Sequence, residues 1–307
     1  MTALRRTLRR LVLALVAATA AARGVLAHAG EDETERLRFD RPEAWAMQYF
    51  ASASILTGLG PPSTRDPWSL DLALEMGWLP HLDQEQRRVG FNGTKVEDLN
   101  RLPVLVRPRL TVGLPARFSL DLSWVPPVEA EGVKSNLVAA ALERPLVERG
   151  RWVLGLRALG QVGEIKGDLT CSEEDASHPP GSPENEFGCQ EPSRDVVGLD
   201  YAGLAVTGGV DLSASGRSSF YYAAGASYLD LEFQVDAMTY DMHDHTLLLA
   251  EGWTYWASAG VSWRAGERTT IAAETFYSPL EVRRGAGAPV EHDDFFNLRL
   301  MLGYRLR

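Results

Sequence analysis

Hydrophobic and polar residues alternate with a period of two in several long stretches of this chain, as they do in a β-strand with one apolar face. In residues 69–79, apolar side chains occupy every second position, and polar or small residues fill the positions between them. Residues 118–124, 152–158 and 296–306 repeat this pattern. The chain is therefore predicted to be an all-β protein.

The alternation predicts an antiparallel barrel of about ten strands. These strands are placed at residues 67–79, 103–113, 117–126, 134–145, 151–163, 196–210, 218–233, 247–263, 268–280 and 294–306. Each has about ten residues or more, as a tilted strand needs to cross a bilayer, whereas soluble strands usually have about 5–6 residues. Short connections alternate with long polar ones, which is typical of outer-membrane barrels with short periplasmic turns and long outer loops.

Aromatic residues at the strand ends favour a membrane barrel over a soluble two-sheet sandwich. One set lies beside the short turns and a second set lies beside the long loops. The first set is Phe118, Trp152, Trp263 and Tyr304, and the second is Trp78, Trp124, Trp253 and Phe296. Two such sets predict two aromatic girdles, one at each interface of the membrane.

The first 29 residues have the layout of a cleaved signal peptide. Four arginines between positions 5 and 10 precede an apolar stretch at 11–22, and Ala27-His28-Ala29 forms a small-x-small cleavage site. The apolar stretch has 12 residues, which is too short for a helix that spans a bilayer. A signal peptide is therefore preferred over a retained anchor helix.

The segment before the first strand, residues 30–65, is predicted to contain a short helix. Asp40-Arg-Pro-Glu43 has the form of a capping box with proline in the first turn. We expect a helix within residues 41–57, either before the barrel or inside it as a plug. If these residues were a strand, they would need a partner, and the barrel would have twelve strands. The predicted organisation is a signal peptide at 1–29, this segment, and the barrel at 66–307.

The alternation, the two aromatic sets and the last strand, Phe295-Phe-Asn-Leu-Arg-Leu-Met-Leu-Gly-Tyr304, resemble bacterial outer-membrane β-barrel proteins as a class. In that class the last strand is the assembly signal and usually ends in an aromatic residue, whereas Arg305-Leu306-Arg307 follow it here. The resemblance implies residence in the outer membrane of a Gram-negative bacterium. The implied partners are the lipids and lipopolysaccharide of that membrane and its assembly machinery. The resemblance names no substrate, and we expect no cofactor.

Nine charged residues are predicted to face the barrel lumen. They are Asp71, Glu75, Arg107, Arg109, Asp121, Arg157, Glu274, Arg299 and Arg305. In one interpretation they line a selective polar pore, and in the other they form an ion-pair network that fills a narrow barrel. Eight-stranded barrels are filled by side chains and water-filled porins have about 16–18 strands, so a ten-stranded barrel lies nearer the filled end.

The two cysteines of the chain, Cys171 and Cys189, lie in one acidic segment. An exported chain meets an oxidising compartment, so we predict a disulfide that staples this loop. Residues 1–29 contain five of the 31 basic residues, which leaves 26 basic and 41 acidic residues, a net charge of 26 − 41 = −15. So negative a chain is not expected to bind nucleic acid, whose phosphates require basic partners.

All five histidines of the mature chain lie in predicted long loops: His81, His178, His243, His245 and His292. His243 and His245 have acidic neighbours, so a surface metal site is one interpretation. Flexible acidic loops produce such clusters by chance, and no metal site is predicted. His243, His245 and His292 are also the candidate bases of a hydrolase at the outer rim, although the sequence pairs no serine with them.

Three functions remain open at the level of the sequence. The preferred one is a non-enzymatic, narrow or gated channel or transporter for small solutes. The second is a structural or adhesive surface barrel whose acidic, disulfide-stapled loops meet the surroundings. The third is a rim-sited outer-membrane hydrolase.

Overall fold

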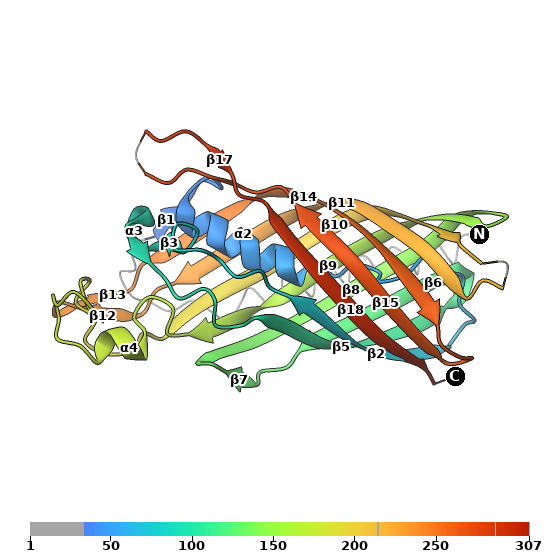
Figure 1. The fold of residues 1–307 in the computed structure, drawn as a ribbon, viewed down its shortest axis with the longest axis horizontal. Helices are drawn as coiled ribbons and strands as arrows, with labels where there is room; N and C mark the ends of the chain where they lie inside the picture. Colours follow the sequence, from blue (N-terminus) through green and yellow to red (C-terminus); the bar gives the residue numbers. More distant parts are fainter. Residues whose placement is uncertain (1–33, 214, 286, 307) are drawn as a thin grey trace, which may run out of the picture. The chain divides into compact units, whose positions relative to one another are not determined.

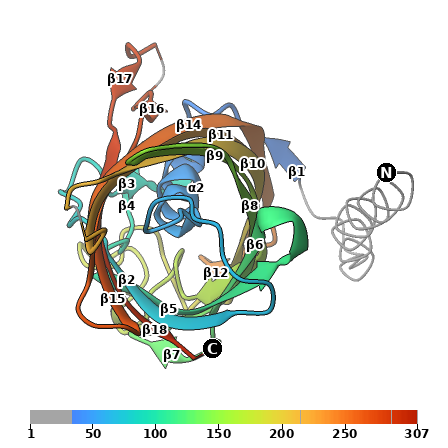
Figure 2. The ribbon, with the colours of Figure 1, turned by 90° about the vertical axis from the view of Figure 1, so that its right-hand side faces the viewer.

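Ten long strands form a closed antiparallel barrel (Figures 1 and 2), so the predicted fold class is confirmed. The computed structural model describes residues 34–213, 215–285 and 287–306, and the predicted signal peptide lies outside them. In chain order the barrel strands are β2 (Leu70–Trp78), β5 (Val104–Leu114), β6 (Phe118–Val125), β8 (Val133–Arg149), β9 (Trp152–Gly167), β10 (Asp195–Asp211), β11 (Ser218–Gln234), β14 (Leu247–Arg264), β15 (Thr269–Ser278) and β18 (Phe295–Arg305). Each pairs with the next, and β18 pairs with β2 to close the ring.

Short connections gather at one end of the barrel and long loops at the other (Figure 1). The short ones are residues 115–117, which form the 3-10 turn η1 (Pro115–Arg117), and residues 150–151, 212–217 and 265–268. The long ones carry small elements: β3 (Arg88–Val89), α3 (Gly90–Gly93), β4 (Lys95–Val96), β7 (Glu129–Ala130), α4 (Glu173–Ala176), β12 (Ala237–Thr239), β13 (Met242–Asp244), β16 (Glu281–Val282) and β17 (Glu291–His292). We call these ends the short-turn end and the long-loop end.

The outer face of the barrel is apolar. In β2, Leu72, Leu74 and Met76 are exposed on the outside, whereas Glu75 between them is buried. The same alternation follows the neighbouring strand β18, where Leu298 and Leu300 are exposed and Arg299 is buried. In a protein surrounded by water this outer surface would be costly, so it indicates contact with lipid. Seven of the eight residues in the two predicted aromatic sets lie within the first or last two residues of a barrel strand, whereas Trp253 lies in the interior of β14.

A charge on the outer face is expected to destabilise the barrel. Leu300 lies in the middle of β18 with 43% of its surface exposed, so Leu300→Arg places a guanidinium against the lipid chains. We expect the free energy of unfolding in lipid vesicles, measured by urea titration, to fall by about 2–4 kcal/mol. Val128→Arg serves as control, because Val128 is 69% exposed in a long loop. Equal stability of the two variants would contradict a lipid-facing β18.

The helix α2 (Pro42–Ser54) lies inside the barrel (Figure 2). Its alanine-rich sequence favours a helix, with Pro42 in the first turn. Eleven of its 13 residues are buried, which fits a helix surrounded by protein on all sides. The predicted helix is confirmed. The alternative of a twelve-stranded barrel is wrong, because residues 42–54 form a helix and not a strand of the ring. β1 (Thr34–Arg36) and β7 enlarge the sheet to twelve strands without entering the ring.

The predicted capping box of this helix is wrong. The residue before the helix is Arg41, and its side chain makes no capping hydrogen bond. Asp40 instead accepts hydrogen bonds from Arg38 and Arg283, at 2.9 and 3.2 Å. The acidic residue that would cap the helix is therefore used to tie the entry of the helix to the loop between β15 and β18.

Residues 34–69 connect the two ends of the barrel, with exposed β1 at one end and α2 inside the lumen. β1 pairs in parallel with the start of β14, at the long-loop end, where Thr34 lies opposite Leu247. At the other end, the Trp68 amide donates to the Gly113 carbonyl beside the β5–β6 turn, at 2.7 Å. None of the helices in the described part of the chain is long and apolar enough to span a bilayer.

Candidate functional site

Four arginines of the barrel wall hold the C-terminal end of α2. Arg107 donates from Nη1 to the Ser54 carbonyl at 2.6 Å, and Arg299 donates from Nη1 to the Ile55 carbonyl at 2.6 Å. Arg109 reaches the Thr57 carbonyl at 2.8 Å, and Arg157 reaches the Leu56 carbonyl at 3.3 Å. We call these residues, Arg107, Arg109, Arg157 and Arg299, the arginine cradle.

The cradle is chemically matched to a helix terminus. The last carbonyls of a helix have no partner within the helix, and the aligned peptide dipoles give that end a partial negative charge. Arg299 also donates to the Ser52 and Ala53 carbonyls, at 3.2 and 3.3 Å. Inside a barrel few waters can satisfy these carbonyls, so the guanidinium groups replace them. The helix is thus fixed by donors from three different strands, β5, β9 and β18.

Four carboxylates balance the charge of the cradle. Glu75 accepts from Arg107 at 2.8 Å, and Asp121 pairs with Arg157 at 2.7 Å. The remaining two are Glu143, 3.6 Å from Arg157, and Glu274, which accepts from the Thr57 hydroxyl at 2.6 Å. The formal charges of four arginines and four carboxylates sum to zero, and paired opposite charges make burial of the cluster tolerable. We call the segment of residues 34–69 the plug. The arrangement is that of an internal ion-pair network, to which residues 52–57 of the plug add their backbone carbonyls.

The predicted lumen residues fall into two groups. Seven are buried together around the end of α2: Glu75, Arg107, Arg109, Asp121, Arg157, Glu274 and Arg299. The other two, Asp71 and Arg305, lie at the short-turn end, with 3.5 Å between Arg305 Nε and Asp71 Oδ1. Arg305 is half exposed there, and its ion pair is with Asp71.

Sequence reasoning missed several wall residues that contact the plug or the cradle, among them Glu143 and Tyr201. Glu143 lies on the same face of β8 as Ala139 and Ala141, so strand alternation could have revealed it. Tyr201 accepts from the Leu56 amide at 2.8 Å, and its hydroxyl lies 3.2 Å from the Ser54 carbonyl. No sequence signal marks Tyr201 as a partner of the plug, because its partners are backbone atoms.

Two cavities lie on opposite sides of the cradle. The outer one, of about 110 Å³, is at the long-loop end between α2 and the wall, and its lining includes Met47, Phe50, Leu137, Ile165, Leu199 and Phe233. The inner one, of about 290 Å³, is at the short-turn end, and its lining includes Asp71, Arg109, Asp121, Glu143, Arg264 and Arg268. The two cavities share no lining residue, and the end of α2 with the cradle separates them. The lining of the outer cavity is mainly apolar, whereas the lining of the inner one mixes charged and polar side chains with apolar ones.

The first long loop forms a roof over the outer cavity. Val89, Leu99 and Leu102 of this loop line the cavity. The Tyr49 hydroxyl of α2 donates to the Pro80 carbonyl at 2.8 Å, so the loop is also attached to the plug. The first long loop therefore contributes to the lining of the outer cavity and is fixed to α2.

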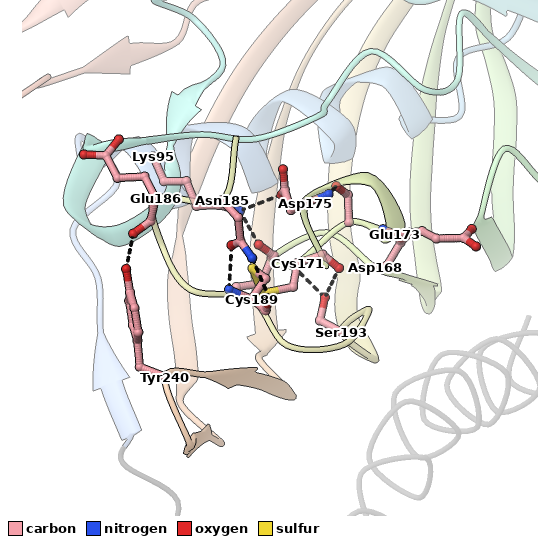
Figure 3. Close-up of a disulfide and its surroundings, with 12 residues drawn as sticks. Lys95, Asp168, Cys171, Glu173, Asp175, Asn185, Glu186, Cys189, Ser193 and Tyr240 are labelled. Carbon is pink, nitrogen blue, oxygen red and sulfur yellow. Dashed lines mark hydrogen bonds and ion pairs between the residues drawn. A yellow bond between two sulfur atoms is a disulfide. The ribbon is translucent and has the colours of Figure 1, made fainter. Parts of the chain in front are cut away.

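A disulfide between Cys171 and Cys189 organises the neighbouring acidic loop, as predicted (Figure 3). The Ser193 hydroxyl accepts from the Cys171 amide at 3.0 Å, and the Asn185 side chain accepts from the Cys189 amide at 2.7 Å. The Tyr240 hydroxyl donates to the Glu186 carbonyl at 2.5 Å (Figure 3) and joins this loop to the β11–β14 loop. The long loops therefore form one connected cap, rather than a set of free solvated segments.

Removing the disulfide is expected to loosen this cap and leave the barrel intact. The two cysteines are 18 residues apart, and closing a loop of this size contributes about 3 kcal/mol in the chain-entropy model. The double variant Cys171→Ala/Cys189→Ala should show faster protease cleavage within residues 168–194. The unfolding midpoint of the barrel should not change. Cleavage at the wild-type rate would show that the hydrogen bonds alone hold the loop.

Lys95 of the roof joins the disulfide loop through a buried ion pair. Lys95 Nζ lies 2.8 Å from Glu97 Oε2 and 3.7 Å from Asp175 Oδ2, and it also donates to the Thr170 carbonyl. Burial raises the pKa of Glu97 from 4.5 to about 7, because desolvation of its carboxylate outweighs the attraction of Lys95. Glu97 therefore titrates near neutral pH.

The contact between roof and disulfide loop is expected to weaken as pH rises. A carboxyl group whose pKa is raised on folding contributes stability that is complete below its unfolded pKa of 4.5 and is lost as pH rises through about 7. Amide hydrogen exchange in residues 87–99 should therefore be faster at pH 8.5 than at pH 5.5, after correction for the intrinsic rates. Glu97→Gln should remove this difference. A difference that persists in Glu97→Gln would assign it to another group.

The structure brings one aspartate–histidine pair of the predicted rim hydrolase together. His243 Nε2 lies 2.7 Å from Asp236 Oδ1. In the part of the chain that the structure describes, no serine hydroxyl is hydrogen-bonded to His243, His245 or His292. The rim thus contains a base without a serine nucleophile next to it.

No family model matches the sequence, and no curated protein matches it. Solved structures of similar fold include the outer membrane protease OmpT from Escherichia coli, with 9% identity, 78% of this chain and 94% of that chain covered, and a TM-score of 0.38. The translocator domain of the autotransporter NalP from Neisseria meningitidis has 10% identity, 87% and 99% coverage and a TM-score of 0.43. The Pseudomonas putida toluene transporter TodX has 11% identity, 83% and 74% coverage and a TM-score of 0.34.

These likenesses assign no activity to the chain. The closed ten-stranded ladder and its apolar outer face decide its class. The chain has the architecture of an outer-membrane β-barrel protein. The predicted resemblance is therefore confirmed at the level of architecture.

Proposed function

We propose that this barrel is a non-enzymatic, gated transporter for small solutes in the outer membrane, with the long loops outside and residues 34–69 as the plug. The observation that carries the proposal is the pair of cavities on either side of the cradle. A barrel with a purely structural role has no need of an apolar chamber under a roof and a polar chamber at the opposite end. The two chambers are the two halves of a pathway that α2 interrupts.

The attachment of the plug favours a movable valve. Hydrogen bonds and buried apolar contacts connect the end of α2 to the wall in the described structure, and the disulfide of the chain lies elsewhere, so no covalent cross-link has to break when the helix moves. The barrel ladder contains no residue of α2, so the ring remains closed when the helix moves. The apolar lining of the outer cavity favours solutes that carry an apolar group, because burial of apolar surface there is favourable.

Solute entry into liposomes tests the proposal. A variant in which residues 42–54 are replaced by a flexible glycine–serine linker should admit small solutes much faster than the intact protein. The control is the intact protein at the same density, with folding of both checked by resistance to protease. A folded variant that admits no solute would contradict the proposal. Loop-dependent surface binding in the same protein would then favour the structural or adhesive alternative.

A further inference from the structure

The loop between β11 and β14 brings two imidazoles and a carboxylate together at the long-loop end. β12 and β13 form a hairpin in which Met238 lies opposite His243. His243 and His245 are two positions apart, so they project to the same side of an extended chain. Asp236 comes from the opposite stem of the hairpin. Three side chains that are able to bind a metal ion therefore meet at the base of one hairpin.

The donor atoms have separations that suit a single ion. His243 Nε2 lies 2.7 Å from Asp236 Oδ1, and His245 Nδ1 lies 4.0 Å from the same oxygen. One ligand atom from each of the three residues lies within 4.8 Å of the others. An ion bound at about 2.0–2.2 Å from its ligands needs ligand atoms roughly 3–4 Å apart, so small side-chain rotations suffice.

The backbone around the three ligands is held in place. The Asp236 amide donates to Asp195 Oδ1 at 3.0 Å, and the Asp236 carbonyl accepts from the Arg194 amide at 2.9 Å. The Val235 amide donates to the Thr246 carbonyl at 2.9 Å, which joins the two stems. These backbone bonds hold both stems of the hairpin in place, so ion binding does not have to order a free loop.

The charge of the site also fits a cation. Within the described part of the chain, the ion pairs of the Asp236 carboxylate are with His243 and His245, and no lysine or arginine lies within ion-pair distance of it. The side chains of His243 and His245 are 45% exposed and that of Asp236 is 34% exposed, which leaves room for water in a further coordination position. Two imidazoles and one carboxylate are a donor set for first-row transition metals rather than for calcium or magnesium, which prefer oxygen ligands.

We propose that Asp236, His243 and His245 bind one divalent transition-metal ion, such as zinc, at the outer rim. The ion joins the two stems of the β12–β13 hairpin. The adjacent loop is already closed by the Cys171–Cys189 disulfide and bonded to this hairpin through Tyr240. A bound metal ion would therefore be a second cross-link among the long loops, after the disulfide. This proposal does not depend on whether the lumen conducts solutes.

Calorimetric titration of the untagged, refolded protein with Zn²⁺ tests the site. We expect one Zn²⁺ per chain, with affinity reduced more than about tenfold in each of His243→Ala, His245→Ala and Asp236→Asn. His292→Ala is the matched control, because His292 is an exposed loop imidazole 3.8 Å from Glu281, and it should bind like the wild type. An excess of Mg²⁺ should not displace the zinc.

Protection of the hairpin amides from hydrogen exchange is a second test of zinc binding. Zinc should slow amide hydrogen exchange within residues 235–246 in the wild type and leave the exchange rates of His243→Ala unchanged. Absence of stoichiometric binding would overturn the proposal. It would also be overturned by displacement by Mg²⁺, or by loss of binding in His292→Ala with retention in His243→Ala.

Discussion

Arg299→Ala is expected to turn a silent barrel into one that opens in planar bilayers. Arg299 is fully buried and donates to three carbonyls at the end of α2, those of Ser52, Ala53 and Ile55. Hydrogen bonds to charged groups contribute about 1.5–3 kcal/mol each to stability, and 1.4 kcal/mol corresponds to a factor of ten. Two of the three bonds are long, at 3.2 and 3.3 Å, so we count about 3 kcal/mol for the set, the value of one strong bond. A loss of this size should raise the open fraction roughly a hundredfold. The triple variant Arg107→Ala/Arg157→Ala/Arg299→Ala should open further.

The ion selectivity of the open state gives an independent check on the same variant. With Arg299 removed, the buried cluster has three arginines against four carboxylates, so the pathway should prefer cations. Arg305→Ala is the matched control, because Arg305 lies at the short-turn end away from α2 and pairs with Asp71. A folded Arg299→Ala protein without channel steps would show that the cradle does not control the plug. Steady conductance of the wild type would show that the plug does not close the lumen.

Glu75→Gln is expected to cause the largest loss of stability among single lumen substitutions. Glu75 pairs with Arg107 at 2.8 Å and with Arg109 at 3.0 Å, and all three side chains are buried. Removing one partner of a buried ion pair leaves an uncompensated charge and costs about 3–5 kcal/mol. Urea unfolding in lipid vesicles, followed by tryptophan fluorescence, measures this loss.

A double-mutant cycle separates the coupling energy of the Glu75–Arg107 ion pair from the effect of each substitution alone. Glu75→Gln/Arg107→Gln restores neutrality, so it should lose less stability than the sum of the two single variants. Glu251→Gln is the matched control, because Glu251 pairs with Arg36 on the exposed surface and should change stability by less than about 1 kcal/mol. Additive losses in the cycle would contradict a buried, coupled pair.

The strands and their faces could be predicted from the sequence because the membrane imposes a simple rule. Every second residue of a strand faces lipid and must be apolar, so the pattern in residues 69–79 and 296–306 gives both the strand and its orientation. The same alternation indicates that Glu75, Arg107 and Arg299 share the inner side. The disulfide could be predicted because the chain has only two cysteines, both in one loop, and is expected to be exported to an oxidising compartment.

The position and attachment of the plug could not be predicted in this way. The partners of the cradle are backbone carbonyls of residues 52–57. Every residue has a backbone carbonyl, so the residue types do not reveal which carbonyls the arginines bind. The helix itself was predictable, although the expected capping by Asp40 was wrong because Arg283 from a distant loop competes for its carboxylate. The base of the β12–β13 hairpin illustrates the same limit, because Asp236 joins His243 and His245 only through hairpin pairing.

Thiol accessibility in the resting protein tests most directly whether the cradle holds α2 in a closed lumen. Both native cysteines are in the disulfide, so Ser54→Cys or Ser63→Cys introduces the single free thiol. Ser54 is 1% exposed at the cradle, whereas Ser63 is exposed at the inner cavity. Maleimide should label Ser63→Cys rapidly and Ser54→Cys only after urea or in combination with Arg299→Ala. Equal, rapid labelling of both in the folded wild-type background would contradict a plugged barrel.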